Sequence, residues 1–480
     1  MGQISLGVFE MLNPNNGLPT WTHPDAKGGD WDRVDYWVGV ARMLDDAGFD
    51  FLFFADTYGY ASIDGEVPRE VIEHGIQFPG LDPMLLIAAL ARETRELGFV
   101  VTSPTTVEHP YASARRFATL DHFTGGRIGW NVVTGSSQST TDRLFGLSDA
   151  GATHNGRYDR ADEFVEVCLK LWEGSWEDGA EARDAGANVY ADATRVRGIE
   201  HRGAHYASSG IFGVAPGRQR TPVLFQAGTS TRGREFAARN AESVFIQGQN
   251  NAQAAGQVAA IRAAAVANGR PADSIKVISG ATVVIGATPA AAAARRAELE
   301  ALYTLGDAAV MFAGMTGIDL RSADPEAPVT EAATAGMDAQ QGQTLVDRYV
   351  RPGQPVPTIG AVLDGFRRQA LRGFQLTGTA DGVADQIGDL VSETGLDGLM
   401  LEPTFGGPDC FADFIGGVLP LLRERGLVPT KDHDGGTPRT LRERLTGGEG
   451  RLAASHPGAR HRPAGSTAPQ PLHAPRKENR

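Results

Sequence analysis

The sequence predicts an α/β protein folded as a closed (β/α)8 barrel, the TIM barrel. Eight short segments rich in β-branched or aromatic residues have the pattern of buried strands, and helical patterns separate most of them. Strands that alternate with helices pair in parallel. The predicted strands are residues 4–9, 50–55, 99–103, 128–133, 223–226, 243–247, 276–285 and 398–402. An open doubly wound sheet is disfavoured, because EMLNPNNGLP after Phe9 contains no Gly-x-Gly-x-x-Gly turn.

The helical segments carry their own boundary signals. An apolar stripe from Val34 to Leu44 follows Asp30 and stops at Gly48, a residue suited to the end of a helix. Asp82 followed by proline predicts a cap and first turn, opening a helix that ends before Gly98. Further apolar stripes over residues 161–168 and 383–391 predict two more helices between strands.

Two connections are too long for plain barrel loops. Residues 135–221 and 287–396 predict long insertions after strands four and seven, on the side where such loops carry specificity or a lid. Residues 1–430 would form the barrel domain. From residue 431 to 480 the chain is rich in Gly, Pro, Arg, His and Ser without periodicity, which predicts a disordered C-terminal tail.

Composition limits the function classes. The net charge of −13 argues against nucleic acid or anionic membranes as partners. We find no signal peptide and no apolar run near the roughly 18 residues that span a bilayer, so a cytoplasmic protein is expected. The two cysteines, Cys168 and Cys410, give neither a disulfide framework nor metal-ligand spacing, and Cys168 is expected to be a buried thiol. No metal site is predicted.

Polar residues stand where predicted strands end, which is where parallel α/β proteins hold ligands. Thr102 ends the third strand, and Asn131 and Thr134 lie at the end of the fourth. Asp56 directly follows the second strand. Its carboxylate could bind a ligand or could cap the next helix, and the residues alone do not decide between these roles.

The segment GTSTRGRE at residues 228–235 follows the fifth strand and opens a helix. It is not a nucleoside-triphosphate loop, because Arg234 and Glu235 stand where Lys and Ser or Thr are required. The hydroxyls of Thr229 and Ser230 with the backbone N–H groups suit one phosphate monoester. The alternative is an ordinary hydroxyl-capped helix.

His154 and Tyr158, four residues apart, are further candidates for ligand contacts at the barrel mouth. Outside the tail the sequence has no Gly-x-Ser-x-Gly elbow and no convincing pair of metal-binding histidines. Hydrolysis by a serine or a metal is therefore poorly supported. A bound cofactor that carries the chemistry fits these groups better, and no catalytic residue is assigned.

The stretch ATLDHFTGGRIGWNVVTGS, preceded by HPYASARRF, resembles the signature of the nitrilotriacetate/dibenzothiophene-sulfone monooxygenase family. These are two-component, FMN-dependent enzymes of the bacterial-luciferase superfamily. Supporting motifs occur in order from about residue 4 to 430, among them FLFFADTYG, RYDRADEFVEVCLKLWE and PVLFQAGTSTRGREFAARNAESVF. The resemblance implies a luciferase-like barrel with FMN across the strand C-termini. The matching flavin-contacting positions are Asp56, Thr102, His154, Tyr158 and Ser230, with Asn131, Thr134 and Thr229 as additional lining residues.

The resemblance also implies a reaction. A separate NAD(P)H:FMN reductase would supply reduced FMN, and the chain would use it with O2 to oxygenate a small organic substrate, in some members with C–N or C–S cleavage. A homo-oligomer is expected, as is common in the family. Alternatives are an F420-dependent oxidoreductase and a flavin-binding protein without catalysis. The chain departs from the family pattern at Pro104 and residues 107–111, close to the expected substrate side.

Overall fold

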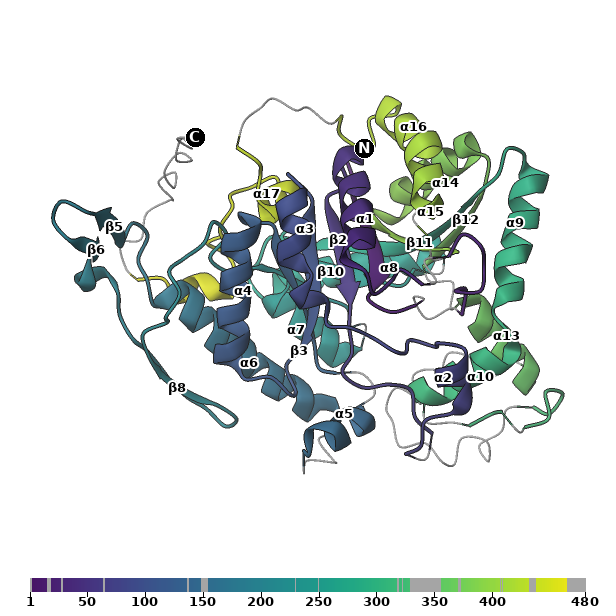
Figure 1. Ribbon diagram of the computed structural model, residues 1–480, viewed down its shortest axis with the longest axis horizontal. Helices are drawn as coiled ribbons and strands as arrows, with labels where there is room; N and C mark the ends of the chain where they lie inside the picture. The colour runs from purple at the N-terminus through teal and green to yellow at the C-terminus, as the bar shows by residue number, and fades with distance from the viewer. Residues whose placement is uncertain are drawn as a thin grey trace.

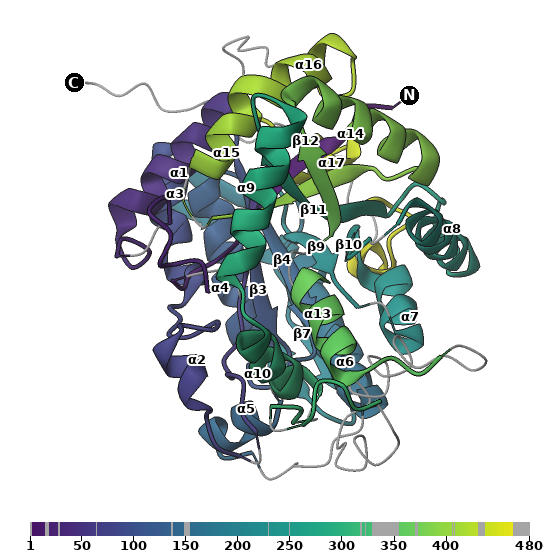
Figure 2. The same cartoon turned by 90° about the vertical axis from the view of Figure 1, so that its right-hand side faces the viewer.

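The computed structural model of the chain contains a closed ring of eight parallel strands (Figures 1 and 2). The structure describes residues 2–14, 19–26, 29–63, 65–135, 138–147, 154–228, 230–248, 250–316, 319–321, 323–328, 355–369, 373–405, 407, 409–430 and 437–463. In chain order the ring is β1 (Ser5–Met11), β2 (Phe51–Ala55), β3 (Gly98–Pro104), β4 (Ile128–Val133), β9 (Val223–Gln226), β10 (Ser243–Ile246), β11 (Lys276–Ile285) and β13 (Gly398–Glu402). The pairings β10–β11, β11–β13 and β13–β1 close it. The predicted barrel and its eight strands are confirmed.

The barrel interior is a packed core. Alternate residues of each strand point inward, and Phe9, Phe53 and Phe245 stack there with ring centroids 5.6–6.3 Å apart. The other faces of the strands meet the surrounding helices in a larger apolar cluster. Because these side chains fill the inside of the ring, a ligand can bind only at an end of the barrel.

Helices cover the outside of the ring. Most follow a strand directly, as the alternating pattern predicts: α1 (Val34–Ala47), α3 (Ile87–Glu93), α4 (Pro110–Thr124), α6 (His154–Gly174), α7 (Thr231–Asn240), α8 (Asn251–Ala267) and α14 (Ala380–Thr394). Gly48 ends α1 in the left-handed region at φ 80°, as expected. Asp82 accepts a hydrogen bond from the Met84 amide, but it caps a short 3-10 turn, Pro83–Leu85, that precedes α3. Cys168 is buried in α6, confirming the expected thiol.

The connection between β4 and β9 carries α5 (Gln138–Phe145), α6 and two hairpins. The hairpins pair β5 (Glu181–Asp184) with β6 (Val189–Ala191), and β7 (Ile199–Arg202) with β8 (Ala207–Gly210). Figure 1 shows them on the side of the molecule far from α9 and α13. Their strands are short and mostly exposed, and therefore carry no strand pattern in the sequence.

The connection between β11 and β13 holds α9 (Pro289–Leu302), α10 (Leu305–Thr316), α13 (Ile359–Gln369), β12 (Phe374–Gly378) and α14. Helices α10 and α13 pack with α2 (Arg69–Glu73) around a second apolar cluster, and Figure 2 shows α9, α10 and α13 along one side of the barrel. Strand β12 was not predicted from the sequence; it extends the sheet outside the ring by pairing with the last half of β11.

The segment after residue 436 closes the opposite end of the barrel. Beyond α15 (Asp409–Asp413), a π-helical turn (Phe414–Val418) and α16 (Leu419–Glu424), the chain forms α17 (Leu441–Thr446) and a 3-10 turn, Pro457–His461. Leu441 and Leu445 enter the interior cluster at the strand N-termini. The Arg442 guanidinium donates to both carboxylate oxygens of buried Glu242, at 2.7 and 2.9 Å, and to backbone carbonyls around it.

The prediction of a disordered tail is therefore wrong for residues 437–463; residues 431–436 and 464–480 lie outside the described residues. The segment is held by the scattered buried side chains Leu441, Leu445 and Leu452 and by the ion pairs of Arg442 and Arg444, which give no regular apolar periodicity in the sequence. Among the described residues, no helix is long and apolar enough to cross a membrane.

We expect Arg442→Ala to lower the free energy of unfolding by about 3–5 kcal/mol, because it leaves the Glu242 carboxylate buried without its cation. The control is Arg460→Ala, which breaks an ion pair between Glu166 and an exposed arginine and should cost about 0–1 kcal/mol. Denaturant unfolding measures both. If both substitutions lowered the free energy of unfolding by the same small amount, Arg442 would not be the residue that holds the C-terminal segment against the barrel.

Candidate active site

Two predicted residues meet on the inner rim of the barrel. Thr102 of β3 lies opposite Asn131 of β4 in the sheet register, and the Asn131 amide donates to the Thr102 hydroxyl at 2.9 Å. Both side chains are about 95% buried. The Asn131 Oδ1 atom has no hydrogen-bond partner. A buried acceptor without a donor is costly unless a ligand or water supplies one, so this amide oxygen suits a ligand N–H or hydroxyl.

Two further polar residues face the mouth from the other side of the ring. Gln247 follows β10 and Glu402 ends β13, and a Cβ added at Gly280 would lie 3.2 Å from Gln247 Oε1 and 3.1 Å from Glu402 Oε1. Both side chains follow the inward alternation of their strands. Neither residue was predicted as part of the site, although each ends a predicted strand with a polar side chain, the signal that identified Thr102.

A second cluster forms around the Tyr158 hydroxyl. It hydrogen-bonds with the side chains of Ser230, Thr134 and Gln226, and burial raises the pKa of this phenol. Arg157 precedes Tyr158 on α6 close enough to favour its ionised form, and burial lowers the pKa of that guanidinium. Three predicted residues, Thr134, Tyr158 and Ser230, are thus brought together. Gln226, which the sequence analysis did not single out, has a buried Oε1 without a hydrogen-bond partner.

Two glycines leave room beside the phenol. A Cβ at Gly228 would lie 2.6 Å from Tyr158 Oη, and one at Gly233 would lie 2.8 Å from the same atom. Ser230 is the N-cap of α7, and its Oγ accepts from the Gly233 amide at 3.0 Å. The hydroxyl-cap alternative is therefore present, together with the contact to Tyr158. A helix N-terminus beside hydroxyl donors and a nearby guanidinium is a favourable setting for an anion.

Arg232 fixes the Tyr158 ring. Its guanidinium lies 5.6 Å from the ring centroid and forms ion pairs with Asp159 and Asp162 at 2.8 and 2.6 Å. Since all four residues belong to α6 or the first turn of α7, this network locks the two helices around the hydroxyl cluster.

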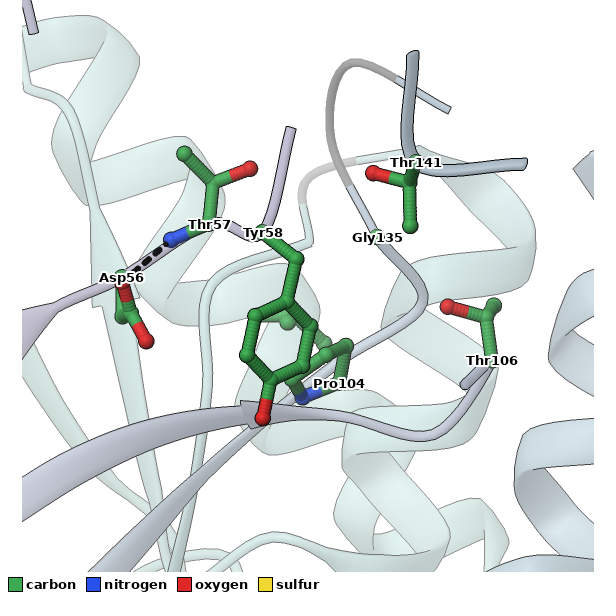
Figure 3. A pocket seen from close by; sticks show the side chains of 8 residues that line it. Asp56, Thr57, Tyr58, Pro104, Thr106, Gly135 and Thr141 are labelled. Atoms are coloured by element: carbon green, nitrogen blue, oxygen red, sulfur yellow. Dashed lines mark hydrogen bonds between the residues drawn. The ribbon is translucent and has the colours of Figure 1, made fainter. Parts of the chain in front are cut away.

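Asp56 lies at the other side of the mouth, in the pocket shown in Figure 3. The pocket is partly open to solvent. Asp56 Oδ1 accepts from the Thr57 amide at 2.8 Å. It caps no helix, since α2, the next one described, begins at Arg69. Burial, helped by the Asp82 charge and opposed by the Thr57 amide, raises the pKa of Asp56 to about 7.

The segment after β4 connects the Asp56 pocket with the cluster around Tyr158. Val133 and Gly135 line the Asp56 pocket, while Thr134 between them bonds to Tyr158. One ligand lying along this segment could therefore touch both. His154 is the first residue of α6, but its side chain, like all of Thr229, lies outside the described residues. Within the described ranges no group of three or more His, Cys, Asp or Glu side chains is arranged for a metal ion.

Comparison with known proteins identifies the family. The sequence profile described as luciferase-like monooxygenase matches residues 16–398. The chain belongs to the luciferase-like monooxygenase family. It is 37% identical to the long-chain alkane monooxygenase of Geobacillus thermodenitrificans (strain NG80-2), over 96% of this chain and 98% of that protein. It is 32% identical to nitrilotriacetate monooxygenase component A of Aminobacter aminovorans, over 91% and 95% of the two chains.

A solved structure of riboflavin lyase with modified FMN and riboflavin superposes with a TM-score of 0.88 at 40% identity, over 96% of this chain and all of that one. These similarities confirm the family predicted from the ATLDHFTGGRIGW motif. In this luciferase-like monooxygenase the two polar clusters occupy the strand C-terminal end, where barrel enzymes carry their active sites.

The raised pKa of Asp56 predicts a pH-dependent stability. The unfolded chain loses this proton near pH 3.8 and the folded chain near pH 7. The folded protein therefore binds more protons between these values, and Asp56 makes it less stable as the pH rises through this range. Asp56→Asn should gain stability relative to the parent protein by on the order of 2 kcal/mol between pH 5 and pH 8. A difference between the two proteins that is independent of pH would contradict the raised pKa.

Proposed function

We propose that this chain is the oxygenase of a two-component system: it binds FMN reduced by a separate NAD(P)H:FMN reductase and uses O2 to oxygenate a small organic substrate. Family membership supports flavin-dependent oxygenation. A separate reductase is supported by the relative named component A, which covers nearly the whole chain. The substrate would take one oxygen atom, and cleavage of a C–N or C–S bond can follow.

The observation that carries the proposal is the cluster around Tyr158. The N-terminus of α7, the Ser230 and Tyr158 hydroxyls and the space left by Gly228 and Gly233 suit one phosphate monoester. Two buried amide oxygens lack donors, that of Asn131 on the inner rim and that of Gln226 beside Tyr158. FMN combines such a phosphate with ribityl hydroxyls and a ring N–H, so the residues present fit this cofactor.

In this proposal each predicted residue has a definite task. Ser230, Tyr158 and Thr134 would hold the phosphate end, and His154 and Thr229 remain candidates beside them. Thr102 and Asn131, on the inner rim of the barrel, would orient the ring system of FMN. Asp56 would lie near the edge of the ring system and, with a pKa of about 7, would hold a proton on Oδ2 near neutral pH, because Oδ1 already accepts from the Thr57 amide.

When bound, reduced FMN supplies the electrons that activate O2. The chain itself must keep water from the reacting atoms and position the substrate. The packed aromatic core below the rim closes one side of the site to solvent. No described residue is assigned as a general acid or base.

The F420-dependent alternative has weaker support. A solved F420-dependent reductase shares the fold at a TM-score of 0.53 but only 16% identity, against 37% for the alkane monooxygenase. Whether the purified protein retains FMN or F420 distinguishes the FMN-dependent oxygenase from the F420-dependent oxidoreductase. A flavin-binding protein without catalysis would retain FMN and yield no oxygenated product.

A second candidate function is cleavage of riboflavin, favoured by the 40% identity to riboflavin lyase. Riboflavin would then be the substrate beside FMN. Its consumption in the presence of reductase, NAD(P)H and O2 tests this role.

The direct experiment supplies the chain with a reductase, NAD(P)H, FMN and ¹⁸O2, and screens alkanes, sulfides, sulfones, aminocarboxylates and riboflavin. We expect ¹⁸O in one product, dependent on both the chain and FMN. Turnover that proceeds without O2, or with F420 in place of FMN, would contradict the proposal.

Ser230→Ala should weaken FMN binding by about 1–2 kcal/mol, the size of a lost hydrogen bond to a charged group. The matched control is Thr379→Ala. Thr379 caps α14 and accepts from a glycine amide, Gly382, as Ser230 does from Gly233. Both substitutions should cost similar helix stability, and only Ser230→Ala should change FMN affinity, measured by quenching of flavin fluorescence. Equal affinities of the two variants would remove Ser230 from the site.

A further inference from the structure

The pocket beside Asp56 has walls that carry no positive charge. Besides Asp56, its lining includes Tyr58, Pro104, Thr106 and Thr141, and no lysine or arginine is among its described lining residues. Figure 3 shows the Tyr58 ring with Asp56 and Thr57 on one side and Thr106 and Thr141 on the other. The apolar surface comes from the ring, the proline and the threonine methyl groups.

The Tyr58 hydroxyl already donates its hydrogen bond within the protein. Tyr58 Oη donates to Glu108 Oε1 at 2.9 Å, and Glu108 Oε2 pairs with Arg116 Nη1 at 2.8 Å. Burial and the Glu108 carboxylate raise the pKa of the phenol. Arg116 is half exposed and is not a lining residue of the pocket. Its charge is used to compensate Glu108, so Tyr58 offers the pocket an apolar ring.

Thr106 supplies a free hydrogen-bonding group. The side chain is 5% exposed, and its Oγ1 atom is buried without a hydrogen-bond partner. Neighbouring Thr105, by contrast, donates its hydroxyl to the Val133 carbonyl at 3.3 Å. A buried hydroxyl without a partner is uncommon in folded proteins. It is therefore a candidate to donate to a molecule that enters the pocket.

We propose that this pocket is the substrate subsite, and that it selects an uncharged small molecule with an apolar body and a hydrogen-bond acceptor over an organic anion, with Thr106 as the group that recognises the acceptor. The inference rests on the proposed function, since it assumes that flavin occupies the neighbouring Thr102–Asn131 and Tyr158 positions. It divides the substrates named for the relatives: a sulfone has the required acceptor and no charge, whereas nitrilotriacetate is a polyanion.

The electrostatics of the surroundings favour this choice. An anion in the pocket would lose its hydration and find no cation among the lining residues, which is costly. It would also lie beside Asp56, with the Asp82 carboxylate close enough to influence both Asp56 and Tyr58. An uncharged sulfone or ketone oxygen would accept from Thr106 while its alkyl part covers Tyr58 and Pro104.

The test uses a pair of probes that differ by one charge. Methyl propyl sulfone and propanesulfonate have the same number of non-hydrogen atoms, with a methyl group exchanged for an anionic oxygen. Binding to the full-length protein, with FMN absent and present, is followed by ligand-observed NMR, which requires no turnover. We expect the sulfone to bind about tenfold more tightly than the sulfonate, or better. Equal affinities, or tighter binding of the sulfonate, would overturn the proposal.

Thr106→Val removes only the hydroxyl, and Thr105→Val makes the same change one residue earlier, outside the pocket lining. We expect the first to weaken sulfone binding about fivefold or more, the size of one lost hydrogen bond, and the second to leave it unchanged. An unchanged affinity in Thr106→Val would overturn the role of Thr106.

FMN binding separates failure of this inference from failure of the proposed function. Displacement of the sulfone by FMN would show that the pocket is part of the flavin site, and the subsite assignment would fall while FMN binding stood. Simultaneous binding of both supports the subsite. If the protein binds no FMN at all, the proposed function fails, and the substrate role falls with it.

Discussion

Closure of the parallel ring is the constraint on which the rest of the structure depends. Because β13 pairs with β1 and β10 with β11, the C-terminal ends of all eight strands meet at one rim. Residues that are far apart in sequence, such as Thr102 and Gln247, therefore face one mouth. The opposite end is closed by α17 through Leu441 and the Arg442–Glu242 ion pair. The aromatic interior between the two ends leaves ligands access only from the rim.

The two sides of the barrel mouth differ in charge. On the side of α7, a helix N-terminus, several hydroxyls and the Arg157 guanidinium favour an anion. On the side of β2, the Asp82 carboxylate disfavours one, and Asp56, whose pKa is raised to about 7, adds a second negative charge only as the pH rises above that value. The segment from Val133 to Gly135 spans both sides. A cofactor with a phosphate at one end and an uncharged ring at the other would lie along this gradient with its phosphate towards Tyr158.

Much of this arrangement was predictable from the sequence. The eight strands are short and apolar and are bounded by turn residues, so periodicity found all of them, and polar residues at their ends pointed to Thr102 and Asn131. The pattern of apolar residues did not identify elements that only a few buried side chains hold in place. Arg442 stands in the highly charged, Gly-containing stretch TPRTLRERLTGGEGR, and nothing in that stretch indicates that this arginine pairs with the buried Glu242, 200 residues earlier. Strand β12 was missed because only Phe374 and Leu376 of its five residues are buried, too few apolar positions to give a strand pattern.

The choice at Asp56 also needed the fold. A carboxylate after a strand can cap a helix or face a ligand, and only the long path to α2 and the burial of the side chain decide against the cap. For Ser230 both readings hold at once: the hydroxyl caps α7 and contacts Tyr158.

The measurement that tests the account most directly is a crystal structure of the full-length protein with FMN bound. The account predicts the phosphate within hydrogen-bond distance of Ser230 and Tyr158, at the N-terminus of α7, and the ring system over Thr102 and Asn131. FMN bound elsewhere, or with its phosphate on the Asp56 side of the mouth, would contradict it.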